Sequence, residues 1–235
     1  MYDSITEINK DTFWTMLDQA ADVCGPDLYA EDEWRADQLQ AMEPRQALRF
    51  HHIAHEYLRL SDKYGLWSAA RLMSPCCIDT DSSFTDFRCW LIAQGKEPYL
   101  AALKNPDSLA KLEPYGDCSF DSLYFVGGNA YEGRTGFLPK EVVVPEDVQR
   151  ELYLLSADIV YAPNIDYPLE WKELEKYLPR LCARYLPPEQ IQANAKLDPM
   201  WNPADPEIQF ARRRYRPLNE PVKTKNLRTK GGDVR

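Results

Sequence analysis

Along most of the chain, apolar and polar residues alternate with the period of an α-helix. The clearest case lies between Pro44 and Gly65, where apolar side chains recur every three or four positions before a glycine. The residues that share this face are Phe50, Ile53, Ala54, Tyr57, Leu58, Ser61 and Tyr64. This pattern predicts a long amphipathic helix with its apolar side in the core.

The same period occurs in further segments, which are separated by Gly, Pro, Asn or Ser turn signals. We expect helices at residues 11–24, 28–42, 66–73, 82–94, 96–104, 120–133, 145–155 and 168–186. Asp11 or Thr12 is expected to cap the first of these helices, and Ser82 or Ser83 the helix at 82–94. Gly95 is expected to end that helix in a left-handed conformation.

Two stretches depart from the helical pattern. Val142–Val144 is the best candidate for a short strand, and beyond Ala195 five prolines argue against long helices. We therefore predict an all-α fold, a bundle-like array of helices with at most a minor short strand pair and an irregular, proline-rich C-terminal strap. The expected organisation is a helical domain at 1–140, a helical extension packed on it at 141–210, and a loosely ordered basic tail at 211–235.

Charge is distributed unevenly along the 235 residues, whose net charge is −9. Residues 211–235 hold nine Lys or Arg against two acidic residues, a charge of +7, so the remaining residues sum to −16. Such an acidic body would repel phosphate, which makes nucleic acid an unlikely ligand. It suits a basic protein partner, because opposite charges speed the encounter.

Nothing in the composition indicates a membrane protein or a cofactor enzyme. No apolar run is long enough to span a bilayer, and the N-terminal residues lack the basic and apolar regions of a signal peptide. The six cysteines have no metal or redox spacing, so we expect reduced thiols, a cytoplasmic location and no cofactor.

Candidate catalytic residues are few. His51 and His55 are spaced like two metal ligands on one helical face, but Glu56 follows the pair, whereas the zincin pattern places its glutamate between the histidines. No nucleophile with a visible base stands out. We therefore expect no catalytic residues and no metal site. The set of residues that a metal-dependent hydrolase would use is Asp79, Asp81, Asp86, His51 and His55.

Residues 74–110 form the stretch around which the rest of the chain is organised. They combine a short acidic loop with a helix rich in aromatic residues, in which Arg88 is flanked by Phe87 and Trp90. We expect Arg88 to be an internal ion-pair or stacking residue, and Trp14 and Trp67 to belong to the core.

Several motifs together resemble a known family. They are FWTMLD at 13–18, LWSAARL at 66–72, FTDFRCWLIAQG at 84–95, NPDSLA at 105–110 and AYEGRTG at 130–136. Over residues 8–140 the chain resembles the bacterial domain-of-unknown-function family 4240. That family has no established catalytic residues to transfer, and its members resemble small helical cytosolic domains.

The resemblance also implies a function, because some similar proteins are immunity proteins encoded beside secreted polymorphic toxins. We therefore expect an immunity protein that neutralises a cognate antibacterial toxin by occluding its active site, and not an enzyme. The toxin would be an ADP-ribosyltransferase or a nuclease with a basic surface. The alternatives are a metal-dependent hydrolase that reverses the toxin's modification, and a regulatory module that binds protein or, through the basic tail, nucleic acid.

The residues expected to contact a basic toxin are acidic residues near the central stretch and one aromatic anchor. They are Asp79, Asp81, Tyr115, Asp117 and Asp121. The sequence leaves the toxin and the oligomeric state open.

Overall fold

The computed structural model describes residues 5–74, 78, 80–113, 118, 120–197 and 200–218, and within these ranges all regular structure is helical. The α-helices are α1 (Lys10–Cys24), α2 (Leu28–Ala41), α3 (Pro44–Leu60), α4 (Tyr64–Met73), α5 (Asp81–Ala93), α6 (Lys96–Lys104), α7 (Ser122–Thr135), α8 (Glu146–Leu154), α9 (Trp171–Tyr177), α10 (Pro179–Tyr185), α11 (Pro188–Leu197) and α12 (Pro206–Arg214). Short 3-10 helices are η1 (Pro106–Lys111), η2 (Pro139–Glu141) and η3 (Leu155–Asp158). The all-α prediction is confirmed.

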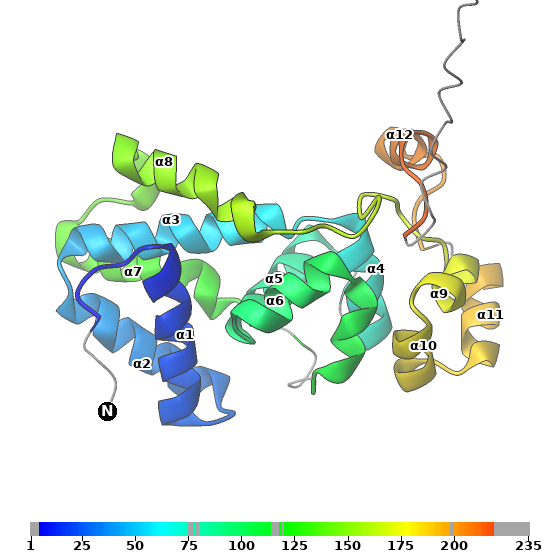
Figure 1. Cartoon of the computed structure of the whole chain (residues 1–235), viewed down its shortest axis with the longest axis horizontal. Coiled ribbons are helices and arrows are strands. Elements are labelled where there is room, and N and C mark those ends of the chain that lie inside the picture. The colour runs from blue at the N-terminus through cyan, green and yellow to red at the C-terminus, as the bar shows by residue number, and fades with distance from the viewer. Residues whose placement is uncertain are drawn as a thin grey trace, which may run out of the picture.

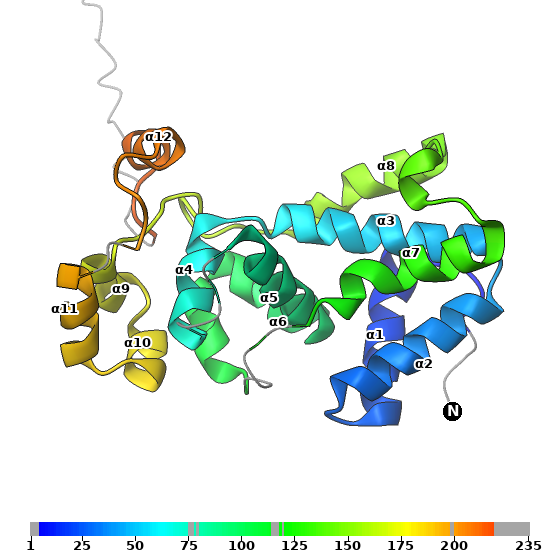
Figure 2. The same ribbon diagram turned by 180° about the vertical axis from the view of Figure 1, so that it is seen from behind.

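The helices follow one another along an elongated molecule (Figure 1). Helices α1, α2, α3, α7 and α8 form one end, α4, α5 and α6 lie in the middle, and α9 to α12 form the other end. Helix α7 returns along α3, although the central helices separate the two in sequence, as the view from behind shows (Figure 2).

Close packing of α3 on α7 depends on glycine. A Cβ atom on Gly127 would lie 2.8 Å from the backbone nitrogen of His51 and 3.0 Å from the carbonyl oxygen of Ala47. Both distances are too short for non-bonded atoms, so any other residue would push the two helices apart. Glycine weakens an isolated helix, and here its small size lets the two backbones approach.

A buried aromatic cluster joins α1, α3 and α6. The Trp14 Nε1–H donates to the Tyr57 hydroxyl at 3.0 Å, and the Tyr99 hydroxyl donates to the Tyr57 carbonyl oxygen at 2.7 Å. The Phe13 ring packs on Phe50 with centroids 4.9 Å apart. The polar ends of these rings are therefore satisfied, which allows them to lie in the core.

Helix α5 fixes the centre of the molecule through Arg88, which is only 8% exposed. Its guanidinium lies over the Phe84 ring, 4.7 Å from the centroid, and donates to the Leu58 carbonyl oxygen at 2.9 Å. The carboxylate of Asp62 is 3.7 Å away. The expectation of a stacking and ion-pair role for Arg88 is confirmed.

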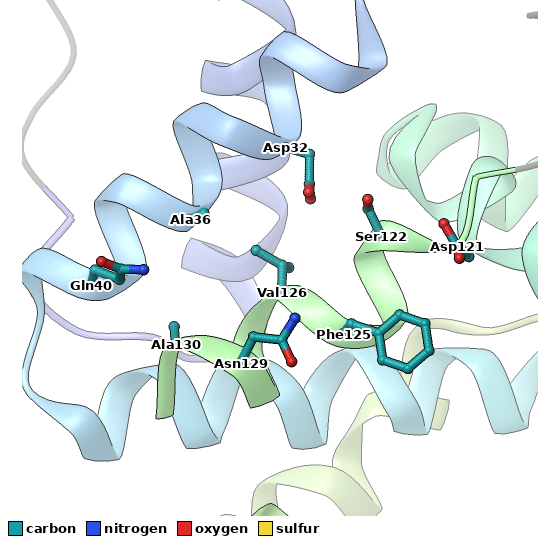
Figure 3. A pocket seen from close by; sticks show the side chains of 9 residues that line it. All are labelled: Asp32, Ala36, Gln40, Asp121, Ser122, Phe125, Val126, Asn129 and Ala130. Atoms are coloured by element: carbon teal, nitrogen blue, oxygen red, sulfur yellow. The ribbon is translucent and has the colours of Figure 1, made fainter. Parts of the chain in front are cut away.

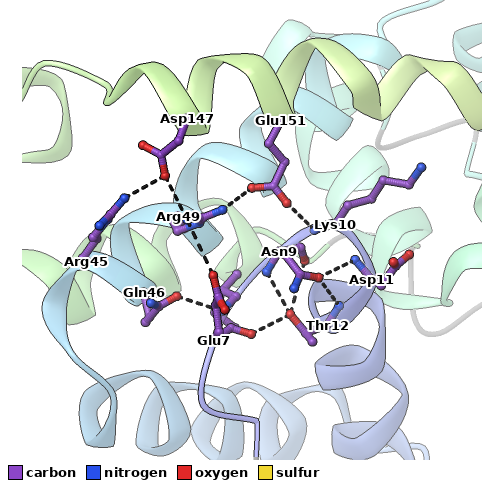
Figure 4. A network of polar contacts seen from close by, with 11 residues as sticks. Glu7, Asn9, Lys10, Asp11, Thr12, Arg45, Gln46, Arg49, Asp147 and Glu151 are labelled. Atoms are coloured by element: carbon purple, nitrogen blue, oxygen red, sulfur yellow. Dashed lines mark hydrogen bonds and ion pairs between the residues drawn. The ribbon is translucent and has the colours of Figure 1, made fainter.

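Helix α8 lies across α1 and α3 and is held there by charged groups (Figure 4). Arg49 donates to Glu151 at 2.5 Å and to Asp147 at 3.2 Å. Arg45 also reaches Asp147, at 2.7 Å, and the backbone N–H of Lys10 donates to Glu151 at 2.7 Å. Glu151 therefore connects all three helices.

The C-terminal helices are attached through backbone groups. The Asp107 carboxylate accepts from the N–H groups of Arg180 and Leu181, both at 3.0 Å, and so satisfies the first turn of α10. The Trp201 Nε1–H donates to the Leu169 carbonyl oxygen at 2.8 Å. The two bonds of Asp107 join η1 to α10, and the bond of Trp201 joins the segment before α12 to the loop before α9.

Two glycines that follow apolar runs have different roles. Gly95 has a φ of +96° directly after α5, as expected from the sequence. The prediction that Gly65 ends the long helix is wrong, because that helix ends at Leu60 and Gly65 lies in the first turn of α4. A Cβ on Gly65 would lie 3.0 Å from the Leu218 side chain, so close packing explains this glycine.

The predicted strand and one predicted helix are corrected. Residues 142–144 form no strand in the described structure; they are a connection between η2 and α8, and no other extended segment pairs with them. The helix expected at 168–186 begins at Trp171 and is divided at Pro179 into α9 and α10. Proline has no N–H and clashes with the preceding turn, which accounts for the break.

Helix starts differ from the expected ones in a systematic way. The side chains that cap α1 and α5 are Asn9 and Thr80, each two residues before the first predicted candidate. The C-terminal strap expected beyond Ala195 is more helical than predicted, because it contains α12, at whose first position Pro206 stands; Pro188 likewise begins α11. Proline is accepted there since the first N–H groups of a helix need no intrahelical partner.

Candidate partner-binding site

A hollow of about 270 Å³ lies between α2 and α7 (Figure 3). Its lining combines carboxylates, amides and a hydroxyl with apolar side chains: Asp32, Ala36, Gln40, Asp121, Ser122, Phe125, Val126, Asn129 and Ala130. No lysine or arginine is among these lining residues. This α2–α7 hollow is small for a substrate cleft and has the size to receive one long side chain.

The position of α7 is set near its C-terminal end and near its middle. Near its C-terminus, Arg134 donates to the carbonyl oxygens of Gln40, at 2.9 Å, and Met42, where α2 ends. Near its middle, Gly127 brings the helix against α3. The face that carries Ser122 and Asn129 is thereby directed toward α2, as Figure 3 shows.

The electrostatics of the hollow are governed by Asp32. Burial raises the pKa of its carboxyl, and the charge of Arg35 and a hydrogen bond with Ser122 act in the opposite direction. Asp121, at the other edge of the hollow, raises the pKa of Asp32 further through like charge. An incoming cation would relieve this repulsion, so the pair favours a positively charged group.

Arg35 does not fill the hollow, because it is fully buried beneath it. Its Nη1 donates to Glu31 at 2.9 Å, and its guanidinium lies 5.6 Å from the centroid of the Phe120 ring. The distance from its Nη2 to the Asp32 carboxylate is 4.0 Å. The Arg35 charge is therefore neutralised mainly by Glu31, and the Asp32 carboxylate is only partly neutralised.

An aromatic edge completes the site. Phe125 lines the hollow and is 49% exposed, and its neighbour Tyr124 is 36% exposed, with ring centroids 4.9 Å apart. Exposed aromatic residues beside a polar hollow are typical of the anchors of protein interfaces. Sequence reasoning singled out neither residue as a contact.

The structure separates the acidic residues that the sequence grouped together. Asp121 lines the α2–α7 hollow, whereas Asp81 lines a different hollow beside Tyr64 and Trp67. The remaining members of the group, Asp79, Tyr115 and Asp117, lie outside the described residues. The hollow is completed by Asp32 and Asn129, which sequence reasoning missed.

The histidines of α3 pack against α7. The His51 and His55 rings have centroids 4.0 Å apart, and His55 Nε2 donates to the Tyr124 carbonyl oxygen at 3.1 Å. Burial lowers the pKa of His51 to about 3, and the charges of the neighbouring histidines contribute. Within the described ranges, no group of three or more His, Cys, Asp or Glu could hold a metal ion.

Two of the buried thiols are poor nucleophiles. Burial raises the pKa of Cys89 to about 12 and that of Cys182 to about 12, so both are neutral at physiological pH. Asp81, which a hydrolase would combine with His51 and His55, lines a hollow with Tyr64 and Trp67, and neither histidine is among the residues that line it. The α2–α7 hollow thus offers binding chemistry more than catalytic chemistry.

Comparison with known proteins assigns the segment that forms the hollow to a protein family. A family model described as Protein of unknown function (DUF4240) matches residues 8–133, a segment that contains every residue lining the hollow. No curated protein and no solved structure shows significant similarity to the chain. Among the described residues, no helix combines the length and apolar character needed to cross a membrane.

Proposed function

The chain belongs to the family described as Protein of unknown function (DUF4240), and on that premise we propose that it is an immunity protein. It would neutralise a cognate antibacterial toxin by binding over the toxin's active site. The contact surface would be the α2–α7 hollow with the aromatic edge formed by Tyr124 and Phe125. Toxins of the ADP-ribosyltransferase or nuclease type fit, because both need a basic cleft for substrates that carry phosphate.

One observation carries the proposal: the α2–α7 hollow joins two carboxylates, those of Asp32 and Asp121, to an exposed Phe125, with no cation in its lining. An arginine or lysine from a partner could enter the hollow while Phe125 packs on apolar surface around it. Interfaces commonly combine such an aromatic anchor with a charged pair that excludes water.

The charge of the whole chain supports the same assignment. A net charge of −9, with all of the acidic excess before residue 211, would attract a basic protein and orient it before contact. Attraction of this kind weakens as salt concentration rises, because ions screen charges beyond about 10 Å at 0.1 M. A partner that binds in this way should associate more slowly at high salt.

The first test is to purify the tagged full chain from the cells that encode it, at low and at high salt. A single stoichiometric partner is expected, and its toxic activity should be abolished by the chain in a purified assay. Phe125→Ser and Asp121→Arg should each weaken inhibition by about tenfold or more.

The matched control is Tyr29→Ser on α2, which removes a 70% exposed aromatic side chain outside the lining of the hollow. It should inhibit as well as the natural chain. If Phe125→Ser and Asp121→Arg also inhibit fully, the α2–α7 hollow is not the contact surface. A partner whose activity is unaffected by the chain would contradict the immunity function itself.

A further inference from the structure

A second groove lies between the first turn of α4 and α12. Helix α4 is in the middle of the molecule, and α12 is at the end away from α2 and α7 (Figure 1). One part of the groove, a hollow of about 350 Å³, is lined by Asp62, Tyr64, Trp67, Asp81, Asp166 and Glu207. The adjoining part, of about 520 Å³, is lined among others by Phe210 and Tyr215. Both parts include Tyr64, Asp166 and Glu207, so they form one continuous α4–α12 groove.

The first part of the α4–α12 groove has an excess of negative charge. Its four carboxylates have two nearby cations: Lys63 lies 3.1 Å from Asp166, and Arg88 lies 3.7 Å from Asp62. Asp81 and Glu207 belong to no ion pair within the described part of the chain. These two carboxylates therefore face the groove without a direct ion pair in the described residues, although the charge of Arg88 also acts on Asp81 at longer range.

The negative charges around the groove act on the hydroxyl of Tyr64. Burial raises its pKa first, and the charges of Glu207, Asp205, Asp62 and Asp166 raise it further. These carboxylates come from α12, from the segment before α4 and from the loop before α9, yet all act on one atom. The carboxylates around Tyr64 therefore make this part of the groove favourable for a positively charged group.

The aromatic wall of the groove is formed by Tyr64, which lines both parts, and by Trp67, which lines the first part. The Tyr64 ring packs edge-on against Trp201 at 5.2 Å, and Trp201 packs in the same way on Trp67 at 5.4 Å. The Trp67 ring in turn stacks on Phe84 at 4.7 Å. Across from this wall, Phe210 on α12 is 54% exposed and offers apolar surface.

We propose that the α4–α12 groove binds a basic peptide segment of another protein, in which an apolar side chain stands next to lysine or arginine. The apolar side chain would lie between Tyr64 and Phe210, and the cations would reach Asp81 and Glu207. Charge complementarity selects this occupant, since nucleic acid and anionic membranes would be repelled by the same carboxylates. The site involves α12, outside the segment that the family model matches, and does not depend on the proposed immunity function.

The experiment measures binding of a fluorescent synthetic peptide, Gly-Arg-Lys-Leu-Lys-Arg-Gly, to the full chain by anisotropy. Asp81→Asn combined with Glu207→Gln should weaken binding by about tenfold. The control, Asp22→Asn combined with Asp37→Asn, removes the same charge from two exposed sites outside the groove and should change affinity less than about twofold. Circular dichroism would confirm that both double variants remain folded.

Three results would overturn the proposal. Equal loss in both double variants would mean that only net charge matters. Equal affinity for a peptide with Ser in place of Leu would remove the role of Tyr64 and Phe210. The third concerns the chain's own basic end, which a variant of the full chain tests by changing four cations to Gln: Lys223, Lys225, Arg228 and Lys230. If this variant binds the peptide more than about threefold more tightly, the occupant of the groove is that segment and not another protein. Affinity within threefold supports an external partner.

Discussion

The α-carbon of Gly127 faces the backbone of His51 so closely that a Cβ atom there would lie 2.8 Å from the His51 nitrogen. This contact brings α7 onto α3 and leaves the opposite side of α7 to form the α2–α7 hollow with α2. The candidate site therefore depends on a residue that does not line it.

Gly127→Ala should destabilise the protein by about 2 kcal/mol or more, because the added methyl group meets backbone atoms that cannot rotate away. Gly133→Ala on the same helix is the control, since nothing lies within 4 Å of the Cβ position there. That change should stabilise by up to about 1 kcal/mol through helix propensity. Urea unfolding measures both. Similar effects of the two changes would contradict the close approach.

Removing the charge of Glu151 should loosen α8. The side chain is 16% exposed, and its partner Arg49 is 12% exposed, so Glu151→Gln leaves a poorly solvated cation. We expect a loss of about 1–2 kcal/mol of stability and faster amide exchange in α8. Glu146→Gln, on a side chain that is 90% exposed, should cost less than about 0.5 kcal/mol. Equal exchange rates in both variants would show that α8 is held by other contacts.

Acid should destabilise the α3–α7 contact through His51. Its folded-state pKa is lowered from 6.5 to about 3, so below pH 6.5 the unfolded chain binds a proton that the folded chain does not. The stability is fully present above pH 6.5 and is lost progressively down to pH 3. His52 and His55 on the same helix have pKa values lowered by burial and act in the same direction.

His51→Gln should therefore reduce the dependence of stability on pH. Between pH 6.5 and 5 the natural chain should lose on the order of 1 kcal/mol more than this variant, after allowance for partial solvent exposure. Urea unfolding at both pH values measures the difference. Carboxyl groups whose pKa is raised by burial, such as Glu31 and Asp107, oppose the effect in both proteins and cancel in the comparison. Parallel pH profiles would rule out His51 as the source.

The sequence predicted the helices and the all-α class because long apolar faces repeat with a helical period regardless of neighbours. It also predicted the role of Arg88, since a charged residue between Phe87 and Trp90 on such a face must be buried and paired. Gly65 and Gly95 show where this reasoning stops. Both glycines follow an apolar run. Only tertiary contacts distinguish Gly95, which has a positive φ after a helix, from Gly65, which leaves space for the Leu218 side chain.

The candidate site was only partly predictable for a similar reason. Asp121 was selected for its charge, but Asp32 reaches the same hollow from a distant part of the chain, through the packing of α7 on α2. Phe125 looked like one more apolar residue of a helix, and its 49% exposure follows from how α7 is rotated by Gly127 against α3. A test of which apolar residues fall outside the buried face would have drawn attention to it.

Replacing Arg88 by lysine should reveal how much of the central core depends on the guanidinium. Its Nη1 donates to the Leu58 carbonyl oxygen at 2.9 Å and its Nη2 to the Thr85 hydroxyl at 2.8 Å, two directions that one ammonium group cannot satisfy together. Arg88→Lys keeps the charge but removes the guanidinium's bond to the buried Leu58 carbonyl oxygen, which then keeps only the Ser61 hydroxyl as a side-chain donor among the described residues, and should cost about 1–3 kcal/mol.

Arg150→Lys is the matched change at a side chain that is 73% exposed and paired only along its own helix with Glu146. It should alter stability by less than about 0.5 kcal/mol. The unfolding temperatures of the two variants show whether the core needs the two diverging N–H donors of the Arg88 guanidinium or only its positive charge. If both variants unfold at the temperature of the natural chain, the hydrogen bonds of Arg88 contribute nothing that an ammonium cannot replace, and α5 is held in the core by its aromatic residues.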